Sequence, residues 1–239
     1  MRDILEIIRD RFSCRVPFDP KRQVSNQDLR QILEAARWAP TAHNMQNYEF
    51  IVIDDEAILA TIGNIRAGPS ETFLRENYEQ LSFSEQELRQ KKTGLLASMF
   101  PASWRRPDAK PEEAAAALRA SLSGSMQNCP LLLIVVYDTR KRAPASEGDM
   151  LGIMSLGCVM QNMWLMAEAL GLGMQILSAV SGEQAEERLH RILEIPDHLK
   201  IAFACRLGYP ETPSGKYLRV RRDVGEFAHR NRYGNRGLG

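Results

Sequence analysis

Pro130-Leu-Leu-Leu-Ile-Val-Val-Tyr137 is an unbroken apolar run in the second half of the chain. Its β-branched and aromatic residues favour a strand over a helix. Because polar and apolar positions do not alternate in this run, we expect both faces of the strand to be covered by other parts of the protein. The segment therefore predicts a sheet with a buried central strand.

The sequence on either side of this run alternates between strand and helix patterns. Further strands are predicted at 49–54, 173–180 and 201–207, and helices around 4–12, from 25 to 40, and from about 150 to 170. Ser25 and Asp28 have the spacing of a helix N-terminus. The helix near 150–170 is strongly apolar, but it carries Gln161, Asn162 and Glu168, so we predict a buried helix and not a membrane span.

Residues 56–128 differ from the rest of the chain. They are polar, with a break at Gly68-Pro69 and scattered aromatic residues, and Ser84 with Glu87 has the pattern of a capping box that begins a helix. We interpret this region as a helical lid and not as a second domain with its own core. The chain is therefore predicted to be a single domain, 1–239, with a lid at about 56–128 and a basic tail at about 211–239.

The composition excludes several classes of protein. The 239 residues are 44% hydrophobic and 26% charged, as in an ordinary globular protein. Lys and Arg number 31 and Asp and Glu 30, and this net charge of +1 argues against nucleic-acid and anionic-membrane partners. The four cysteines and four histidines have no metal-binding or dithiol spacing, so we expect no metal. The N-terminus lacks the apolar core of a secretory signal, and we expect a cytoplasmic protein.

Three local patterns suggest a bound cofactor, because no nucleophile or nucleotide-loop motif is present. Arg11-Phe-Ser-Cys-Arg15 sets two guanidinium groups around a hydroxyl, which suits a phosphate, although alone it is better explained as a solvated helix end. Ala39-Pro-Thr-Ala-His-Asn-Met-Gln46 offers polar groups that match a flavin rim, or is simply a loop of turn formers. Arg219-Val-Arg-Arg222 would close the same phosphate site, or form a basic surface tail.

In this order and spacing, the patterns resemble the FMN-dependent nitroreductase superfamily. The resemblance covers nearly the whole chain, and its segments are 11–15, 36–50 (ARWAPTAHNMQNYEF), 161–178 (QNMWLMAEALGLGMQILS), 207–210 (LGYP) and the arginines that follow. It implies an α+β fold with a central mixed, mainly antiparallel sheet flanked by helices. It also implies an intertwined homodimer in which the tail wraps the partner subunit and two FMN sites lie at the interface.

The resemblance further implies a set of binding residues. Those expected to bind FMN are Arg11, Phe12, Ser13, Cys14, Arg15, Thr41, Ala42, Asn44, Gln46, Ile176, Leu177, Ser178, Arg219 and Arg221. Arg11, Ser13 and Arg15 are expected at the phosphate and ribityl chain, and Arg221 is expected to complete the phosphate grip. The protein is expected to contribute no catalytic side chain, because FMN carries the chemistry. The lid residues Tyr78, Phe100 and Trp104 are expected to stack on a planar substrate.

The implied activity is that of an FMN oxidoreductase with NADPH or NADH as electron donor. It would reduce a small planar aromatic acceptor, such as a nitroaromatic or a quinone, by ping-pong hydride transfer. The alternatives are a flavin-dependent dehalogenase or dehydrogenase of the same superfamily, and a non-enzymatic FMN-binding protein. Leu74 stands where a deiodinase carries a glutamate four residues before Tyr78, which disfavours an amino-acid substrate.

Overall fold

The computed structural model describes residues 2–65, 76, 80–99, 129–142, 149–177, 180, 182–212 and 218–236. The chain forms two compact units. Unit 1 comprises residues 1–68 and 119–214, and unit 2 comprises residues 69–118 and 215–239.

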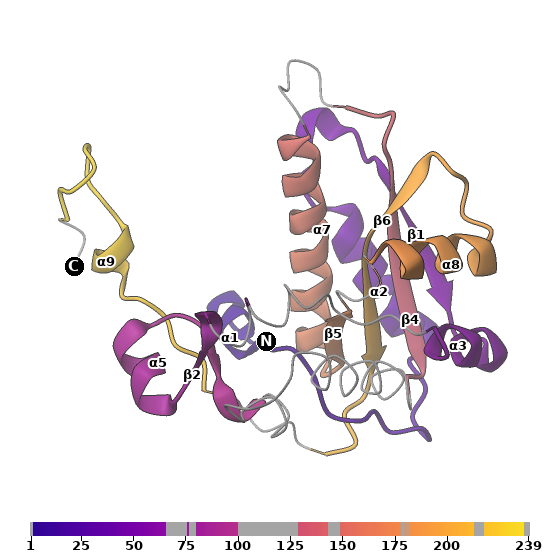
Figure 1. Cartoon of the computed structure of the whole chain (residues 1–239), viewed down its shortest axis with the longest axis horizontal. Helices are drawn as coiled ribbons and strands as arrows, with labels where there is room; N and C mark the ends of the chain where they lie inside the picture. The colour runs from indigo at the N-terminus through magenta and orange to yellow at the C-terminus, as the bar shows by residue number, and fades with distance from the viewer. Residues whose placement is uncertain are drawn as a thin grey trace. The chain divides into compact units, whose positions relative to one another are not determined.

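Unit 1 is built on a four-stranded sheet with the strand order β1-β4-β6-β5 (Figure 1). The strands are β1 (Tyr48–Ile53), β4 (Leu131–Asp138), β5 (Gly173–Leu177) and β6 (Leu199–Gly208). Each neighbouring pair is antiparallel. The four strands predicted from the apolar runs are confirmed, and the run at 130–137 forms the interior strand β4.

The uniform hydrophobicity of β4 has a direct structural reason. Leu131, Leu133 and Val135 belong to a core on one face of the sheet, which we call the first core. The residues between them, together with Val136, belong to a core on the opposite face, the second core. Successive side chains of a strand point to opposite faces, so both sets must be apolar. The prediction that both faces of this strand are covered is confirmed.

Helices cover both faces of the sheet. The first core is covered by α2 (Asn26–Arg37) and α7 (Met150–Ala169), and the second by α3 (Glu56–Gly63) and α8 (Glu183–Leu193) (Figure 1). The short helix α1 (Ile4–Asp10) packs against α7. An antiparallel sheet flanked by helices confirms the predicted α+β fold, whereas the intertwined homodimer stays a prediction.

The helix α7 is long and strongly apolar. Among the described residues it is the one helix whose length and mean hydropathy would allow it to cross a membrane. The core helix of a globular protein has the same composition. Val159, Met163 and Ala167 are fully buried in the first core, which agrees with the prediction of a buried helix.

Unit 2 contains the described part of the lid and the C-terminal tail. Its elements are the parallel pair β2 (Ser82–Phe83) and β3 (Leu95–Leu96), with α5 (Glu85–Lys91), η3 (Ala97–Met99) and α9 (Val224–Phe227). The capping box predicted at Ser84 and Glu87 is present and begins α5. Lys92 follows α5, and its Nζ lies 2.9 Å from Asp223 Oδ2 and 2.9 Å from Glu226 Oε1. These ion pairs join the lid segment to the tail.

A hydrogen-bonded carboxylate connects the start of α2 to the end of β6. Ser25 Oγ accepts a hydrogen bond from Asp28 N at 3.0 Å, which confirms the predicted helix start. The Tyr209 hydroxyl donates to Asp28 Oδ2 at 2.8 Å. The hydrogen bonds from Tyr209 and Ser25 lower the pKa of Asp28 below its ordinary value, because both stabilise the charged carboxylate.

Tyr209→Phe is expected to lower the free energy of unfolding at neutral pH by about 1 kcal/mol, because a hydrogen bond to a carboxylate is lost. A carboxyl group whose pKa is depressed by folding stabilises the protein above its unfolded-state pKa. That contribution disappears as the pH falls through the folded-state pKa. The difference between wild type and Tyr209→Phe should therefore shrink on acidification below about pH 4. Urea unfolding at neutral and acidic pH measures it.

Tyr48→Phe is the matched control for this experiment. The Tyr48 hydroxyl donates to a neutral acceptor, the main-chain oxygen of Ala36, at 3.2 Å. Its loss should therefore cost the same stability at both pH values. A Tyr209→Phe difference that is equally independent of pH would contradict the assignment of the pKa shift to this hydrogen bond.

Candidate functional site

Residues 11–15, which we call the arginine segment, are extended. The periodicity predicted a helix running into this segment, but α1 ends at Asp10, and Arg11 has φ −49° and ψ 128°. The helix ends because Cys14 N donates instead to Met174 O of β5, at 3.0 Å. Alternate residues of an extended chain point to opposite sides, and Cys14 is fully buried while Arg15 is exposed. The R-x-S-x-R spacing therefore sets its two arginines and its serine on the side opposite Cys14.

The arginine segment is fixed along the outer edge of β5. This strand ends the sheet order, so its outer edge is available to the Cys14 amide. Trp164 of α7 donates from Nε1 to Phe12 O at 3.0 Å. The Arg11 guanidinium carbon lies 4.6 Å from the centre of the Trp164 ring, a cation–π contact. The segment is thus held from both the sheet and α7.

The Cys14 thiol faces the interior and is not a reactive group. Burial raises its pKa, so the thiol stays protonated at neutral pH. The contribution of Cys14 to the segment is its main chain.

Two paired glycines make room for the chain that follows the arginine segment. Gly173 of β5 and Gly208 of β6 lie directly opposite each other in the register. A Cβ on Gly173 would lie 2.5 Å from Cys14 Sγ, and a Cβ on Gly208 would lie 2.5 Å from Phe18 Cγ. Both separations are far shorter than a normal contact between such atoms. Glycine at these two positions therefore allows residues 14–18 to lie against the strands.

Gly208→Ala is expected to destabilise the protein by about 1–3 kcal/mol, because the new methyl group overlaps the Phe18 side chain. Denaturant unfolding measures the change. Gly157→Ala in α7 is the control, because no described atom lies within 4 Å of its Cβ position. Alanine is also the better helix former by about 1 kcal/mol, so this control should keep or gain stability. Unchanged stability of Gly208→Ala would show that residues 14–18 do not press on β6.

Residues 41–46, which we call the polar loop, have an unusual backbone. The loop contains the short helix η1 (Ala42–Asn44). His43, Asn44 and Gln46 have φ values of 51°, 53° and 43°, in the left-handed region. Residues with a side chain pay roughly 1–2 kcal/mol each for this conformation, and such strain concentrates at binding sites. The sequence predicted a loop rich in polar groups here, but not its strain.

Hydrogen bonds hold the polar loop in this conformation. Ala42 N donates to Ser155 Oγ at 2.9 Å, and Ser155 Oγ donates to Leu151 O at 2.7 Å. Within the loop, Gln46 Nε2 donates to Asn44 Oδ1 at 2.9 Å. Ser155 was missed as a site residue. Its only signal in the sequence is a hydroxyl on an otherwise apolar stretch of helix.

The structure brings two of the predicted parts of the site together. Ile176 and Leu177 belong to β5, the strand whose outer edge carries the arginine segment. Ile176 packs against the first core and Leu177 belongs to the second. Ser178 lies outside the described residues.

The polar loop lies at a different place along α7. It is bonded to Ser155, whereas the arginine segment is bonded to Trp164. Nine helical residues separate these two anchors, which corresponds to about 14 Å along the helix axis. A single chain therefore presents its polar loop and its arginine segment at opposite halves of α7.

The remaining predicted residues lie in unit 2 or outside the described residues. Arg219 and Arg221 precede α9, and Arg221 Nη1 donates to Val220 O at 2.7 Å. Their convergence with the arginine segment, which belongs to unit 1, stays a prediction. The predicted substrate residues Tyr78, Phe100 and Trp104 are outside the described residues.

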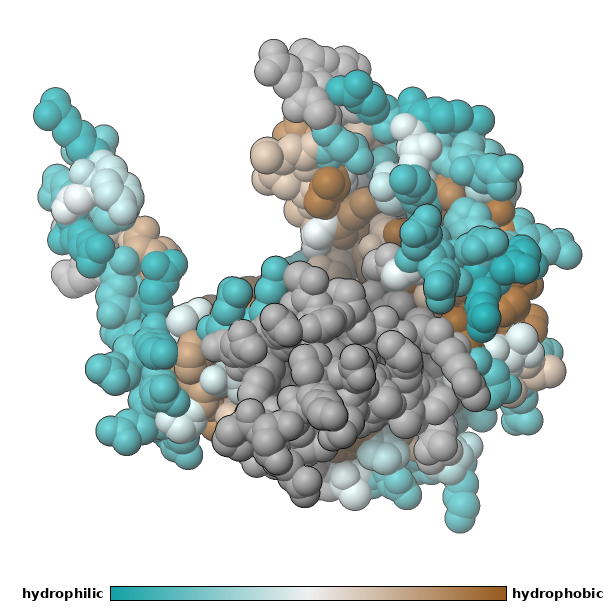
Figure 2. Space-filling view, viewed as in Figure 1, coloured by the Kyte–Doolittle hydropathy of each residue, from teal (hydrophilic) through white to brown (hydrophobic). Residues whose placement is uncertain are grey.

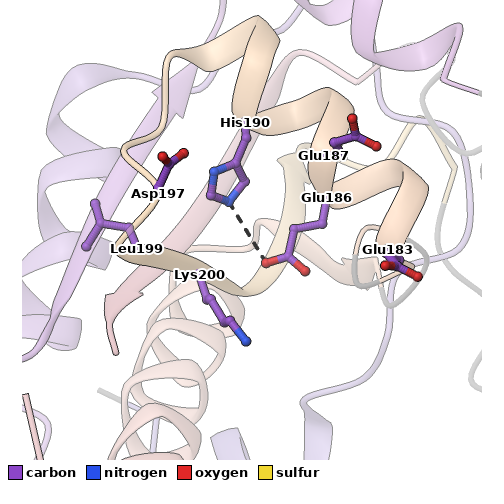
Figure 3. Close-up of a pocket in the computed structure, with 7 residues that line it drawn as sticks. All are labelled: Glu183, Glu186, Glu187, His190, Asp197, Leu199 and Lys200. Atoms are coloured by element: carbon purple, nitrogen blue, oxygen red, sulfur yellow. Dashed lines mark ion pairs between the residues drawn. The ribbon is translucent and has the colours of Figure 1, made fainter. Parts of the chain in front are cut away.

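A pocket of about 420 Å³ lies beside α8 and the start of β6 (Figure 3). It is lined by Glu183, Glu186, Glu187, His190, Asp197, Leu199 and Lys200. The carboxylates of this set would repel a phosphate, and none of the predicted site residues lines the pocket. Among the described residues, no group of three His, Cys, Asp or Glu side chains could hold a metal ion. The pocket therefore does not fit a phosphate-bearing cofactor.

Residues 8–209 match the nitroreductase family. The chain belongs to this family. The arginine segment, the polar loop, β5 and the turn at Gly208-Tyr-Pro210 all start or lie within the matched residues. The resemblance found in the sequence is therefore confirmed.

Relatives of this nitroreductase-family chain span its whole length. A protein of Archaeoglobus fulgidus, named as an NADH dehydrogenase/NAD(P)H nitroreductase, is 24% identical over 98% of this chain and 100% of its own. An NADPH-dependent oxidoreductase of Staphylococcus saprophyticus is 24% identical over 89% of this chain and 68% of its own.

Solved structures of nitroreductases share the fold. One from Desulfitobacterium hafniense with bound FMN is 20% identical, with a TM-score of 0.58 over 96% of this chain and 98% of its own. Another from Bacteroides fragilis with bound FMN is 18% identical, with a TM-score of 0.54 over 93% of this chain and 95% of its own. At this level of identity the likeness shows the fold alone.

Proposed function

We propose that this protein is an FMN-dependent oxidoreductase that takes electrons from NADPH or NADH. It passes them to a small planar aromatic acceptor, such as a nitroaromatic or a quinone. The observation that carries the proposal is the arginine segment, whose main chain is fixed along the outer edge of β5 by α7 and by the strand itself. Relatives named as an NAD(P)H nitroreductase and an NADPH-dependent oxidoreductase support the electron donor.

The residues present fit FMN. Arg11 and Arg15 suit its phosphate, because guanidinium–phosphate hydrogen bonds are charge-assisted and can be bidentate. The Ser13 hydroxyl can donate to the same group. Ile176 and Leu177 offer apolar side chains and main-chain groups of β5 for the ring. Bound FMN supplies the two-electron chemistry, and the residues of the chain bind and orient it.

We further propose that two copies of the chain form each site. The polar loop and the arginine segment lie at opposite halves of α7, so the polar loop of a second copy can complete a site around the first copy's arginines. Met150, Ile153 and Met154 of α7 are 70%, 61% and 59% exposed, and apolar residues gather on this part of the surface (Figure 2). Exposed groups of large apolar side chains are typical of protein interfaces. The tail at about 211–239 is proposed to wrap the second copy.

The proposal extends to the acceptor and the compartment. Tyr78, Phe100 and Trp104 of the lid are proposed to stack on the acceptor ring. All four cysteines are free thiols, as is usual in the reducing cytoplasm, where we place the protein.

An anaerobic titration with NADPH and NADH tests the function. The purified protein is expected to be yellow or to bind added FMN, and its flavin colour is expected to bleach rapidly with one of the two donors. Turnover of a nitroaromatic, a quinone and a halophenol then separates the reductase from a dehalogenase or dehydrogenase. Flavin colour that persists with both donors would favour a non-enzymatic FMN-binding protein, and a colourless protein that ignores FMN would refute the proposal.

A further inference from the structure

Arg206 of β6 is a buried cation that lies behind the arginine segment. Its exposure is 3%, in a strand interior where nearly every other residue is apolar. Its Nη2 donates to Val16 O at 3.0 Å and to Cys14 O at 3.3 Å. Its Nε donates to Gln175 Oε1 of β5 at 2.7 Å, and its guanidinium carbon lies 4.6 Å from the centre of the Phe18 ring.

These contacts fix the main chain on both sides of Arg15. The carbonyl of Cys14 belongs to the peptide group that precedes Arg15, and the carbonyl of Val16 follows it. One guanidinium that binds both carbonyls restrains the backbone dihedral angles of Arg15, and so restrains the direction of its side chain. The bond to Gln175 orients the guanidinium on the sheet.

A charge at this position needs a reason beyond packing. Burying a cation is costly unless hydrogen bonds compensate for its lost hydration. An arginine keeps its charge even where burial lowers its pKa, as it does here. Electrostatic attraction is also less screened in the interior than at the surface, so this charge attracts an anion bound to the outer side of the segment.

We propose that Arg206 is a positioning residue for the phosphate of FMN. It does not touch the cofactor. It fixes Arg15 from behind and adds positive charge beneath the segment. This inference rests on the proposed function, because it assumes that the arginine segment binds the FMN phosphate.

A comparison of FMN with riboflavin, which lacks the phosphate, tests the inference. Dissociation constants for both flavins are measured with wild type, Arg206→Met and Arg206→Lys. Arg206→Met is expected to weaken FMN binding by about 10- to 100-fold, the range seen when a group that orients a binding residue is removed. Riboflavin binding is expected to change little. Arg206→Lys keeps the charge without the two-pronged geometry and should lose less than Arg206→Met.

Arg191→Met is the matched control, because the Arg191 side chain on α8 is 70% exposed. It should leave both dissociation constants unchanged. Equal weakening of FMN and riboflavin by Arg206→Met would show a purely structural role and overturn the inference, as would an unchanged preference for FMN. If Arg206→Met does not fold, Gln175→Met gives the second reading. It leaves the charge in place but removes its orienting partner, and it should reduce the preference for FMN, whereas an unchanged preference overturns the inference.

The behaviour of wild type separates the two levels of the argument. Wild type that binds neither flavin refutes the proposed function itself. Wild type that prefers FMN, combined with an Arg206→Met variant that keeps the same preference, refutes only the role of Arg206.

Discussion

The double variant Arg11→Ala, Arg221→Ala is expected to purify without flavin and to bind added FMN at least about 100-fold more weakly than wild type. Each arginine is proposed to donate charge-assisted hydrogen bonds to the phosphate. Removing two such groups costs about 3 kcal/mol or more, which corresponds to more than 100-fold in affinity. Titration of the apoprotein with FMN, followed by flavin fluorescence, measures the loss.

The fold of this variant should survive, which makes the loss of flavin interpretable. Arg221 is exposed, and Arg11 is partly buried against the Trp164 ring, so the change removes one cation–π contact from the described structure. Far-UV circular dichroism and the unfolding midpoint check this. The control Arg188→Ala, Arg191→Ala removes the same charge from α8 and should keep full FMN binding. Full flavin occupancy in the Arg11, Arg221 variant would refute the phosphate assignment.

The strands were predictable because burial on two faces leaves a local signature. The run at 130–137 is apolar at every position, since its alternate side chains enter the first and second cores. Such a pattern reports burial but does not name the neighbouring strands. The antiparallel order β1-β4-β6-β5 was therefore expected only from the family resemblance, and not from periodicity.

The site was predictable where its geometry is local. The R-x-S-x-R spacing matches the two-residue repeat of an extended chain, so its polar side chains share a side. The groups that support it were not predictable. Trp164, Gly208 and Arg206 all lie more than 140 residues further along the chain, and only folding brings them to residues 11–18.

The strain in the polar loop was hidden for a different reason. Asparagine tolerates the left-handed region, so Asn44 gives a weak signal, but His43 and Gln46 give none. Their conformation is imposed by a bond between Ala42 and a helix residue far along the chain, Ser155. Propensity describes each residue alone and cannot include this constraint.

The double variant Ile153→Glu, Met154→Glu is expected to convert a wild-type dimer into a monomer. Both side chains are more than half exposed on α7, and each is proposed to be buried against the second copy. Full burial of such a side chain contributes about 1.5–3 kcal/mol. Loss of the two in each chain should raise the dimer dissociation constant by about 1,000-fold or more. Light scattering over a range of protein concentrations measures the change.

Ile58→Glu is the matched control for this variant. Ile58 lies on α3, on the opposite side of the sheet from α7, and it is 37% exposed. It should leave the dimer intact. Wild type that is monomeric at micromolar concentration, or a double variant that stays dimeric, would contradict an interface at α7. The monomer also tests the shared site: its arginine segment is intact, yet it should bind FMN weakly, because the polar loop of the second copy is missing. A monomer that binds FMN as tightly as wild type would place the whole site within one chain.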